Sequence, residues 1–559
     1  MSKTQKIRTI FIFFVFCLLY LVILFNLYLI QIRQSAFFSY LGKRQYNVTV
    51  SRYATRAEIF DRTGKQPLAL NKDCLSAFVL PNQLTKPQKT KQFLATHFPD
   101  AFKQLQAGPK KSFLFVQRKL TDKQKKLIEN HNLKDIKLLR ERGRFYPVAS
   151  AGTVVGATSI DNKGLFGIEY QFDKQLGGTP AIYSLEQEAR SGNFYFKKET
   201  QQKGQAGKPI TLTIDSNLQF LAHEELIDAI KKWDAQEGAA IVINPDNGEI
   251  LAMVSAPDFD PNNFKHVDLA HTKNKVVTES YEYGSIAKVW AALAALAEDV
   301  VTLDEKIDCC GKKTAYVDGR KINTLVAHGV LSFSEVVERS NNIGIAKVAK
   351  RINEKLYDHY TKIGLGKKTG IPFPGEQSGF VNHPTNWSKQ SIISLSYGYE
   401  TTCTLLQIAQ AFCMIARDGV PVQPKLILSD TPVFAPSELP FDKTQDRLRA
   451  SPQIYKKQTI DLLKQILENT TLRGTARRAG ISGYRVMSKT GTANLLVDGQ
   501  YDSEKNIYTC AGIVQKDDYQ RVIVAFVKEA QKNNAYASTV AAPLFEKIAE
   551  KILIHDKVI

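Results

Sequence analysis

Apolar positions dominate the start of the 559-residue chain. From Ile10 to Ile30 the sequence is apolar apart from Asn26 and two tyrosines, a run of 21 residues. About 20 apolar residues are enough for a helix to cross the hydrocarbon core of a bilayer. We therefore expect a transmembrane anchor over residues 9–31, preceded by a cytoplasmic tail of residues 1–8.

Basic residues set the expected orientation of this anchor. Lys3, Lys6 and Arg8 precede it and Arg33 follows it, which favours a cytoplasmic N-terminus. A cleaved signal peptide is the alternative, but the apolar run is long for one and no small-residue cleavage site follows it closely. We expect an uncleaved, single-pass anchor in the cytoplasmic membrane, with the rest of the chain outside.

The remaining chain alternates between strand and helix periodicity. Residues 32–205 predict a mixed, β-rich segment that ends in a polar linker at 197–204. Beyond it the pattern predicts strands at 211–215, 239–244 and 484–528, and helices at 217–233, 541–554 and through much of 285–412. Strands at both ends of a helical middle predict an α+β domain over 206–559, with an antiparallel sheet flanked by helices beside an all-helical subdomain.

The chain carries a formal net charge of +20. Its basic residues are dispersed and no recognisable nucleic-acid-binding module accompanies them, so we expect no nucleic-acid partner. The densest basic stretch runs from Lys110 to Arg144. A solvated basic face is the first interpretation, and attraction to anionic lipid headgroups or wall polymers is the second.

The seven cysteines show no metal-binding spacing. Adjacent Cys309 and Cys310 seldom pair with each other, and a disulfide from either to a distant cysteine stays open. We expect most cysteines to be buried as small hydrophobic side chains.

Ser285 and Lys288 form an S-x-x-K pattern. Three residues apart, they share one face of a helix, and the apolar segment 289–297 is typical of a buried helix. Gly284 suits a tight entry that places the serine at the helix N-terminus, where developing negative charge is stabilised. A serine needs a base to become a nucleophile, and a lysine desolvated beside other cations can be neutral enough to be that base. Alone, the pair also fits an ordinary helix.

A second pattern, S-x-N, starts at Ser340 and ends at Asn342, after a short helix at 334–339. The serine can relay a proton, and the amide two residues later can hydrogen-bond a peptide. The alternative is a turn or a helix cap.

The third pattern, K-T-G-T, consists of Lys489, Thr490, Gly491 and Thr492. It lies in an expected strand at 484–493, which a turn at Asp498-Gly499 joins to another strand at 508–514. An edge strand here would offer its backbone to a peptide, and its Lys and Thr side chains to a terminal carboxylate. Another K-T-G, at 368–370, leads into a Pro- and Gly-rich loop, and we assign it to structure.

With the three patterns in this order, the chain resembles a class B penicillin-binding protein, a membrane-anchored peptidoglycan DD-transpeptidase. The resemblance covers nearly everything from about residue 50 onward. Further matches to the family's motifs are at 56–64, 144–147, 164–169, 176–178, 244–253 and 374–376, and at Asn274, Tyr281 and Glu282.

The chain departs from the family pattern at four positions. Tyr283 and Ile286 replace a proline and a threonine around the serine. Ser488 replaces the glycine that commonly precedes K-T-G, and Ala57 replaces a juxtamembrane glycine. None of these changes removes a reactive group, although they can alter β-lactam preference.

The resemblance implies a pedestal (dimerisation-type) domain over 32–205 and a penicillin-binding transpeptidase domain over 206–559. It also implies a two-step acyl transfer on the D-Ala-D-Ala end of peptidoglycan stem peptides, with neither a metal nor an organic cofactor. β-Lactam antibiotics would mimic that end and acylate the serine.

The resemblance implies a role for each residue of the three patterns. Ser285 attacks while Lys288 takes its proton, and Ser340 passes a proton to the departing D-alanine. Asn342 holds the peptide amide. The oxyanion is held by the backbone N–H groups of Ser285 and Thr492, and the terminal carboxylate by Lys489, Thr490 and Thr492, with Gly491 giving the ligand room.

Within the family, the compact pedestal and the spacing from Asn274 to Lys288 favour the division-specific type. This type implies a membrane-embedded glycan polymerase and other division proteins as partners, and a location at the septum. Three alternatives stay open: an elongation-specific transpeptidase, a membrane-anchored β-lactamase or β-lactam sensor, and a non-catalytic division scaffold.

Overall fold

The computed structural model describes residues 3–52, 54–107, 113–187, 194–428 and 452–558. The chain forms two compact units: Met1–Arg56 with Gly177–Lys208, and Ala57–Leu176 with Pro209–Ile559. This grouping differs from the expected domain boundaries, which stay a prediction.

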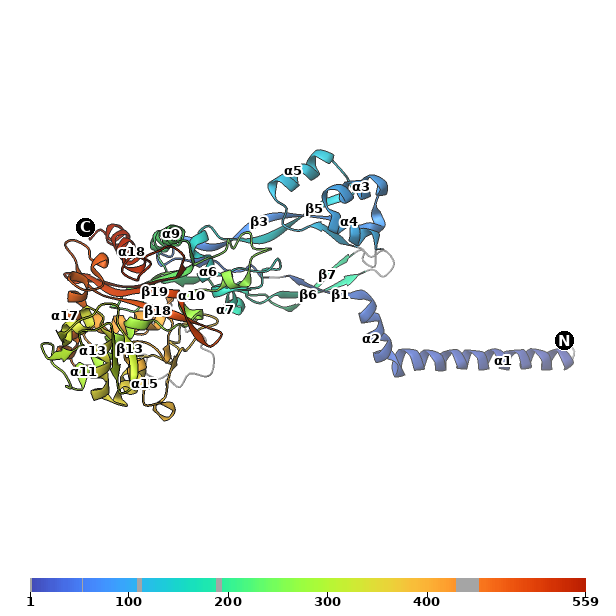
Figure 1. Ribbon diagram of the computed structural model, residues 1–559. Helices are drawn as coiled ribbons and strands as arrows, with labels where there is room; N and C mark the ends of the chain where they lie inside the picture. The colour runs from blue at the N-terminus through green and yellow to red at the C-terminus, as the bar shows by residue number, and fades with distance from the viewer. Residues whose placement is uncertain (1–2, 53, 108–112, 188–193, 429–451, 559) are drawn as a thin grey trace. The chain divides into compact units, whose positions relative to one another are not determined.

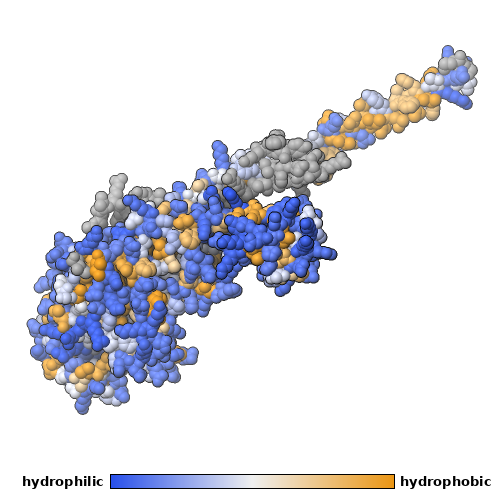
Figure 2. Space-filling model, turned by 90° about the horizontal axis from the view of Figure 1, so that it is seen from above, coloured by the Kyte–Doolittle hydropathy of each residue, from blue (hydrophilic) through white to orange (hydrophobic). Residues whose placement is uncertain are grey.

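The first unit begins with a long apolar helix. The helix α1 (Lys3–Tyr28) continues through a π-helical turn, η1 (Leu29–Arg33), to α2 (Ser35–Tyr46). Its apolar side chains are exposed and form the orange rod of Figure 2. The helix is long and apolar enough to cross a membrane, which confirms the helix expected here. The strands β1 (Asn47–Arg52), β6 (Ala181–Gln187) and β7 (Phe194–Gln202) form an antiparallel sheet.

A five-stranded antiparallel sheet organises the second unit. Its order is β10 (Ile250–Ala256), β9 (Ala235–Ile243), β20 (Tyr519–Ala530), β19 (Gln500–Lys516) and β18 (Arg485–Val497). The strand β18 is therefore an edge strand. The turn between β18 and β19 falls at Asp498 and Gly499, as the sequence predicts.

The two faces of this sheet are covered by different helices (Figure 1). The helices α9 (Ser216–Trp233) and α18 (Ala541–His555) cover one face, and the helical subdomain packs on the other. Alternate residues of β20 divide between the faces, since successive side chains of a strand point in opposite directions. Ile523 belongs to the core under α9 and α18, whereas Val524 belongs to the core of the helical subdomain.

The helical subdomain is built around α11 (Ala287–Ala297), which is buried almost throughout. The other helices are α10 (Lys275–Thr278), α12 (Phe333–Glu338), α13 (Asn342–Ile352), α14 (Lys355–Lys362), α15 (Ser391–Ser396), α16 (Leu405–Ala416) and α17 (Lys457–Leu472). Three small strand pairs accompany them: β11 (Lys306–Asp308) with β14 (Val330–Ser332), β12 (Thr314–Val317) with β13 (Arg320–Asn323), and β15 (Phe380–Val381) with β16 (Thr401–Thr402). Strands of two to four residues are too short to give a periodic signal.

Residues 57–176 form the part of this unit that we call the head. Its strands are β2 (Ile59–Phe60), β3 (Pro67–Val79), β4 (Leu114–Gln117) and β5 (Ile136–Phe145), which β8 (Ile210–Leu212) and β17 (Ile427–Leu428) join in one sheet. The helices α3 (Pro87–His97), α4 (Pro99–Gln106) and α5 (Asp122–His131) enclose a separate small core. The short helices α6 (Gly152–Val155), α7 (Gly167–Gln171) and α8 (Asp173–Gly177) follow.

All seven cysteines are free thiols. Cys309, Cys403, Cys413 and Cys510 are buried, in agreement with the expectation that most serve as small hydrophobic side chains.

Candidate active site

Ser285 lies in a turn whose backbone conformation and close packing require glycine at positions 284 and 491. It is the middle residue of the 3₁₀ turn η5 (Gly284–Ile286), directly before α11. Gly284 has a φ of +51°, and a Cβ atom on it would lie 2.3 Å from the carbonyl oxygen of Thr492. Conversely, a Cβ atom on Gly491 would lie 2.4 Å from the carbonyl oxygen of Tyr283. Two facing glycines thus let β18 approach the serine turn at backbone distance.

Lys288 lies one helical turn after Ser285, and its side chain is completely buried. Its Nζ atom lies 2.9 Å from the Oγ atom of Ser285, 2.9 Å from the Oγ atom of Ser340 and 2.7 Å from the carbonyl oxygen of Ser340. A neutral amine can donate to the two Ser340 acceptors and accept the proton of the Ser285 hydroxyl.

Burial favours that neutral form. Desolvation, assisted by the nearby charge of Lys489, holds the pKa of Lys288 well below its ordinary value. Burial also lowers the pKa of Lys489 to about 7. Of the described carboxylates, none forms an ion pair with either amine, so no ion pair counteracts the desolvation.

Ser340 connects the two lysines. Its Oγ atom accepts a hydrogen bond from Lys288 at 2.9 Å and another from Lys489 at 3.1 Å. Ser340 adopts a left-handed backbone conformation, with a φ of +55°, between α12 and α13. Such a conformation costs a non-glycine residue roughly 1 kcal/mol or more, and it is kept here by the contacts of the side chain and of its neighbours.

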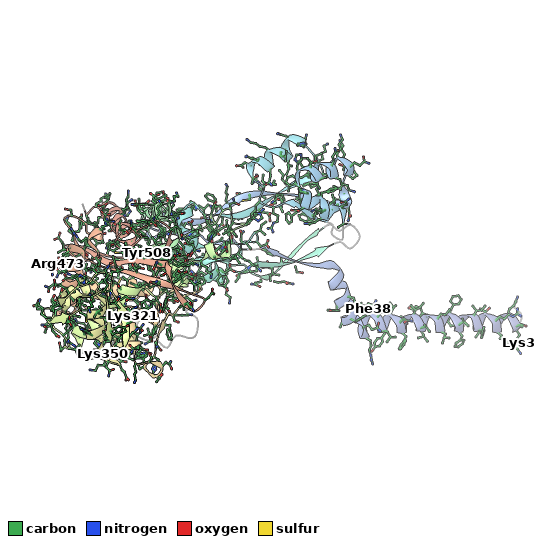
Figure 3. The ribbon with its side chains drawn as sticks, viewed as in Figure 1. Lys3, Phe38, Lys321, Lys350, Arg473 and Tyr508 are labelled. Carbon is green, nitrogen blue, oxygen red and sulfur yellow. The ribbon has the colours of Figure 1, made fainter. Side chains whose placement is uncertain are left out.

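An ion pair between Arg473 and Glu338 holds the end of α12, directly before the Ser340 loop. The buried carboxylate of Glu338 accepts two hydrogen bonds from the guanidinium group of Arg473, at 2.8 and 3.1 Å. Arg473, labelled in Figure 3, caps the C-terminus of α17, so the pair joins α17 to the end of α12. A bidentate pair of this kind fixes geometry as well as adding stability.

Asn342 lies in the first turn of α13 and is half-buried. Its Nδ2 atom donates to the carbonyl oxygen of Asn323, in β13, at 2.7 Å. In the described chain nothing donates to its Oδ1 atom, which can therefore accept from a peptide N–H group. The preceding Asn341 caps α13 by accepting from the N–H group of Gly344 at 2.8 Å. The helix-cap interpretation is thus confirmed for Asn341, and the role of Asn342 in binding a peptide amide stays a prediction.

The K-T-G-T residues lie on the edge strand β18, as expected. Lys489 also donates to the carbonyl oxygen of Thr490 at 2.8 Å, and the Thr490 hydroxyl donates to Thr475 at 3.0 Å. Thr492 pairs in register with Tyr508, which Figure 3 labels on β19. The strand therefore brings Lys489 to Ser340, and Thr492 to the turn that holds Ser285.

Two of the departures from the family pattern are accommodated locally. Ser488 is buried, and its Oγ atom lies 2.8 Å from the Oγ1 atom of Thr471 in α17. The residue opposite it in β19 is Gly512, which leaves room for the added side chain. Tyr283 is buried between the rings of Tyr281 and Phe526, and its hydroxyl group has no hydrogen-bond partner among the described residues.

Spacing along the chain does not predict which residues hold these groups in place, although Glu282 also matches the family pattern. Besides Thr475 and Arg473, one such residue is Glu282, whose carboxylate accepts from the Tyr501 hydroxyl at 3.1 Å and from the N–H group of Glu400 at 2.9 Å. Glu282 and Arg473 lie more than 100 residues from their partners in the chain, where no spacing rule operates, and Thr475 lies 15 residues from Thr490. The second K-T-G lies in a loop, in which Thr369 binds Glu376.

The sequence comparisons agree with this geometry. The family model of the penicillin binding protein transpeptidase domain matches residues 238–550, and that of the penicillin-binding protein dimerisation domain matches residues 51–212. The chain belongs to the penicillin-binding protein transpeptidases. The family and the enzyme class predicted from the sequence are thereby confirmed, as is the α+β fold class.

Curated relatives of the chain match over most of their length. Stage V sporulation protein D of Bacillus subtilis is 30% identical over 98% of the chain and 85% of its own length. The probable peptidoglycan D,D-transpeptidase PbpC of Pseudomonas aeruginosa is 28% identical over 98% of the chain and 95% of its own length. Peptidoglycan D,D-transpeptidase FtsI of Escherichia coli is 28% identical over 80% of the chain and 73% of its own length.

Among solved structures, penicillin binding protein 3 of Mycobacterium tuberculosis, complexed with aztreonam, has a TM-score of 0.68 and 25% identity. The match covers 91% of the chain and 98% of that structure. With the N-terminal apolar helix, these relatives indicate a membrane-anchored transpeptidase.

Proposed function

We propose that this protein cross-links peptidoglycan stem peptides through an acyl-enzyme on Ser285. The hydrogen-bonded chain from Ser285 through Lys288 and Ser340 to Lys489 carries the proposal, because it joins a nucleophile to a base whose pKa burial lowers and to a proton relay. The names of the curated relatives support peptidoglycan as the substrate.

In the first step, the Oγ atom of Ser285 attacks the carbonyl carbon of the penultimate D-alanine while its proton passes to Lys288. The oxyanion is held by the N–H groups of Ser285 and Thr492, donors that typically contribute about 3 kcal/mol each. Collapse of the intermediate breaks the peptide bond, and the D-alanine leaves with a proton relayed by Ser340. An amine of a second stem peptide then attacks the ester and regenerates Ser285.

The substrate would be held by the groups around this relay. Lys489, Thr490 and Thr492 would bind the terminal carboxylate, and Asn342 the peptide amide. Gly491 leaves the edge strand free of a side chain where the substrate backbone approaches. These roles need no metal or organic cofactor.

A peptide assay tests this function. The purified full chain in detergent, incubated with a synthetic pentapeptide ending in D-Ala-D-Ala and an amine acceptor, should release D-alanine and form the transfer product. Ser285→Ala should do neither. Absence of both products with the wild-type protein would favour a non-catalytic scaffold.

We further propose that β-lactams acylate Ser285, since solved relatives are complexed with aztreonam and ampicillin. A long-lived penicillin adduct is the expected result. Rapid hydrolysis of the drug without an adduct would instead indicate a β-lactamase, and a lasting adduct without peptide transfer would indicate a sensor.

We propose a septal role, with a membrane-embedded glycan polymerase and other division proteins as partners and with the catalytic part outside the cytoplasmic membrane. The relatives named FtsI support this choice. Depletion of the protein in its own organism should give filaments with blocked septa. Rounded cells would indicate the elongation role.

A further inference from the structure

The head carries much of the positive charge of the chain. Residues 85–142 contain 15 Lys and Arg against 5 Asp and Glu, a net charge of +10 out of the chain's +20. The transpeptidase chemistry uses none of these residues. Such a concentration of one sign raises the local potential and attracts anions.

A cavity of about 670 Å³, which we call the head cavity, lies within this charged segment. Its walls are α3, the end of α5 and the loop that leads into β5, which lie together in the head (Figure 1). Lys86 and Lys89, at the start of α3, and Lys134, in the loop before β5, line it. In the described chain none of their ammonium groups has an ion-pair partner, so all three charges are available to a ligand.

Asp135, the acidic residue that lines the cavity, is fully engaged with the protein. Its Oδ1 atom accepts from the N–H group and hydroxyl of Thr85, at 2.8 and 2.7 Å, and its Oδ2 atom accepts from Lys86 N–H and the Thr90 hydroxyl, both at 2.9 Å. Although burial opposes ionisation, these bonds lower the pKa of Asp135 to about 2. The carboxylate therefore fastens the loop to the start of α3.

An aromatic cluster gives the cavity a fixed wall. The ring of Phe93 lies 4.9 Å from that of His97 and 4.8 Å from that of His131, centroid to centroid. The Nδ1 atom of His131 lies 2.9 Å from the carbonyl oxygen of Leu127 and donates to it, which fixes the ring against α5. Both imidazoles line the cavity.

From this arrangement we propose that the head cavity binds a phosphate-bearing anion. A phosphate group offers several strong acceptor oxygens to the three ammonium groups that line the cavity, two from the start of α3 and one from the loop before β5. The phosphate can belong to a lipid headgroup or to a soluble phosphate ester, and both share this chemistry.

Calorimetric titration of the full chain in nonionic detergent with inorganic triphosphate tests the proposal. Combined Lys86→Ala, Lys89→Ala and Lys134→Ala should weaken binding by about tenfold or more, as expected for the loss of charge-assisted hydrogen bonds. The matched control, Lys91→Ala with Lys123→Ala and Lys126→Ala, removes the same charge from α3 and α5 outside the cavity lining. It should change affinity by about twofold or less.

Penicillin labelling verifies that the transpeptidase part of both variants is folded, and far-UV circular dichroism verifies the helices of the head. Equal affinity of the wild type and the cavity variant, equal losses in both variants, or no saturable binding would overturn the proposal. A second titration compares short-chain phosphatidylglycerol with glycerol phosphate. Tighter binding of the first identifies a lipid headgroup as the source, and tighter binding of the second a soluble phosphate ester, while both results require the cavity lysines.

Discussion

The reactivity of Ser285 depends on the charge state of two buried lysines. Both amines are desolvated, and this burial lowers the pKa of each lysine because it disfavours the charged form. Because the folded-state pKa of Lys489 is about 7, below its ordinary value, this amine loses its proton as the pH rises through 7. The loss also removes a positive charge that lies near Lys288. Because this charge helps to keep Lys288 neutral and is proposed to bind the carboxylate of the ligand, acylation should slow as the pH rises through about 7, as stopped-flow measurement with a fluorescent penicillin can show.

Lys288→Arg separates the role of the base from that of the charge. An arginine side chain stays protonated, so it keeps a cation near Ser285 but cannot take the proton. We expect acylation to slow by roughly 10²–10⁴-fold across the pH range. Lys350→Arg, on an exposed residue of α13 labelled in Figure 3, is the control and should acylate normally. A wild-type rate in Lys288→Arg would exclude Lys288 as the base.

The buried hydroxyl group of Tyr283 has no hydrogen-bond partner among the residues that the structure describes. Tyr283→Phe removes an unsatisfied polar group and should leave the free energy of unfolding unchanged or raise it by about 1 kcal/mol. Its neighbour Tyr281 donates to Glu237 at 2.9 Å, so Tyr281→Phe should lower it by about 1 kcal/mol. Thermal unfolding of the two variants measures both effects. A larger loss in Tyr283→Phe than in Tyr281→Phe would show that the Tyr283 hydroxyl is bonded in solution.

At the level of elements, the site depends on how closely β18 approaches η5. Gly491→Ala would place a Cβ atom 2.4 Å from the Tyr283 carbonyl oxygen and 2.8 Å from the Ile286 side chain. The strand must move away, and Lys489 moves with it. We expect penicillin labelling to slow by about tenfold or more, since small misplacements of reacting groups are costly.

Gly329→Ala is the matched control for this variant. A Cβ atom on Gly329 meets nothing within 4 Å, so labelling should stay at the wild-type rate. Normal labelling of Gly491→Ala would show that the contact between β18 and η5 is looser than the structure indicates.

The elements that carry the reactive groups follow from local sequence signals. The spacing of Ser285 and Lys288, the apolar stretch of α11 and the turn at Asp498 each predict their own geometry. The residues that hold the reactive groups in place are not predicted in this way, because Thr475, Arg473 and Tyr501 reach their partners only after the chain has folded. The three small strand pairs were also missed, since their hydrogen bonds rather than any hydrophobic pattern define them.

At the scale of the whole second unit, the head and the transpeptidase part share both a sheet and polar contacts. The strand β2 of the head pairs in parallel with β8, and Ser216 donates to Asp61 at 2.9 Å. An ion pair of 3.1 Å joins Arg62 to Glu249. The residues of the juxtamembrane family motif thus fasten the head to the catalytic part, which explains how a motif remote from Ser285 contributes to one folded unit.

The central claim is that Ser285 forms a lasting covalent acyl-enzyme. Intact-mass measurement of the full chain after exposure to fluorescent penicillin, beside Ser285→Ala, tests it most directly. We predict a stable one-to-one adduct on the wild-type protein and none on the variant. An adduct that persists in Ser285→Ala, or a wild-type protein that never gains the mass of the drug, would contradict the account.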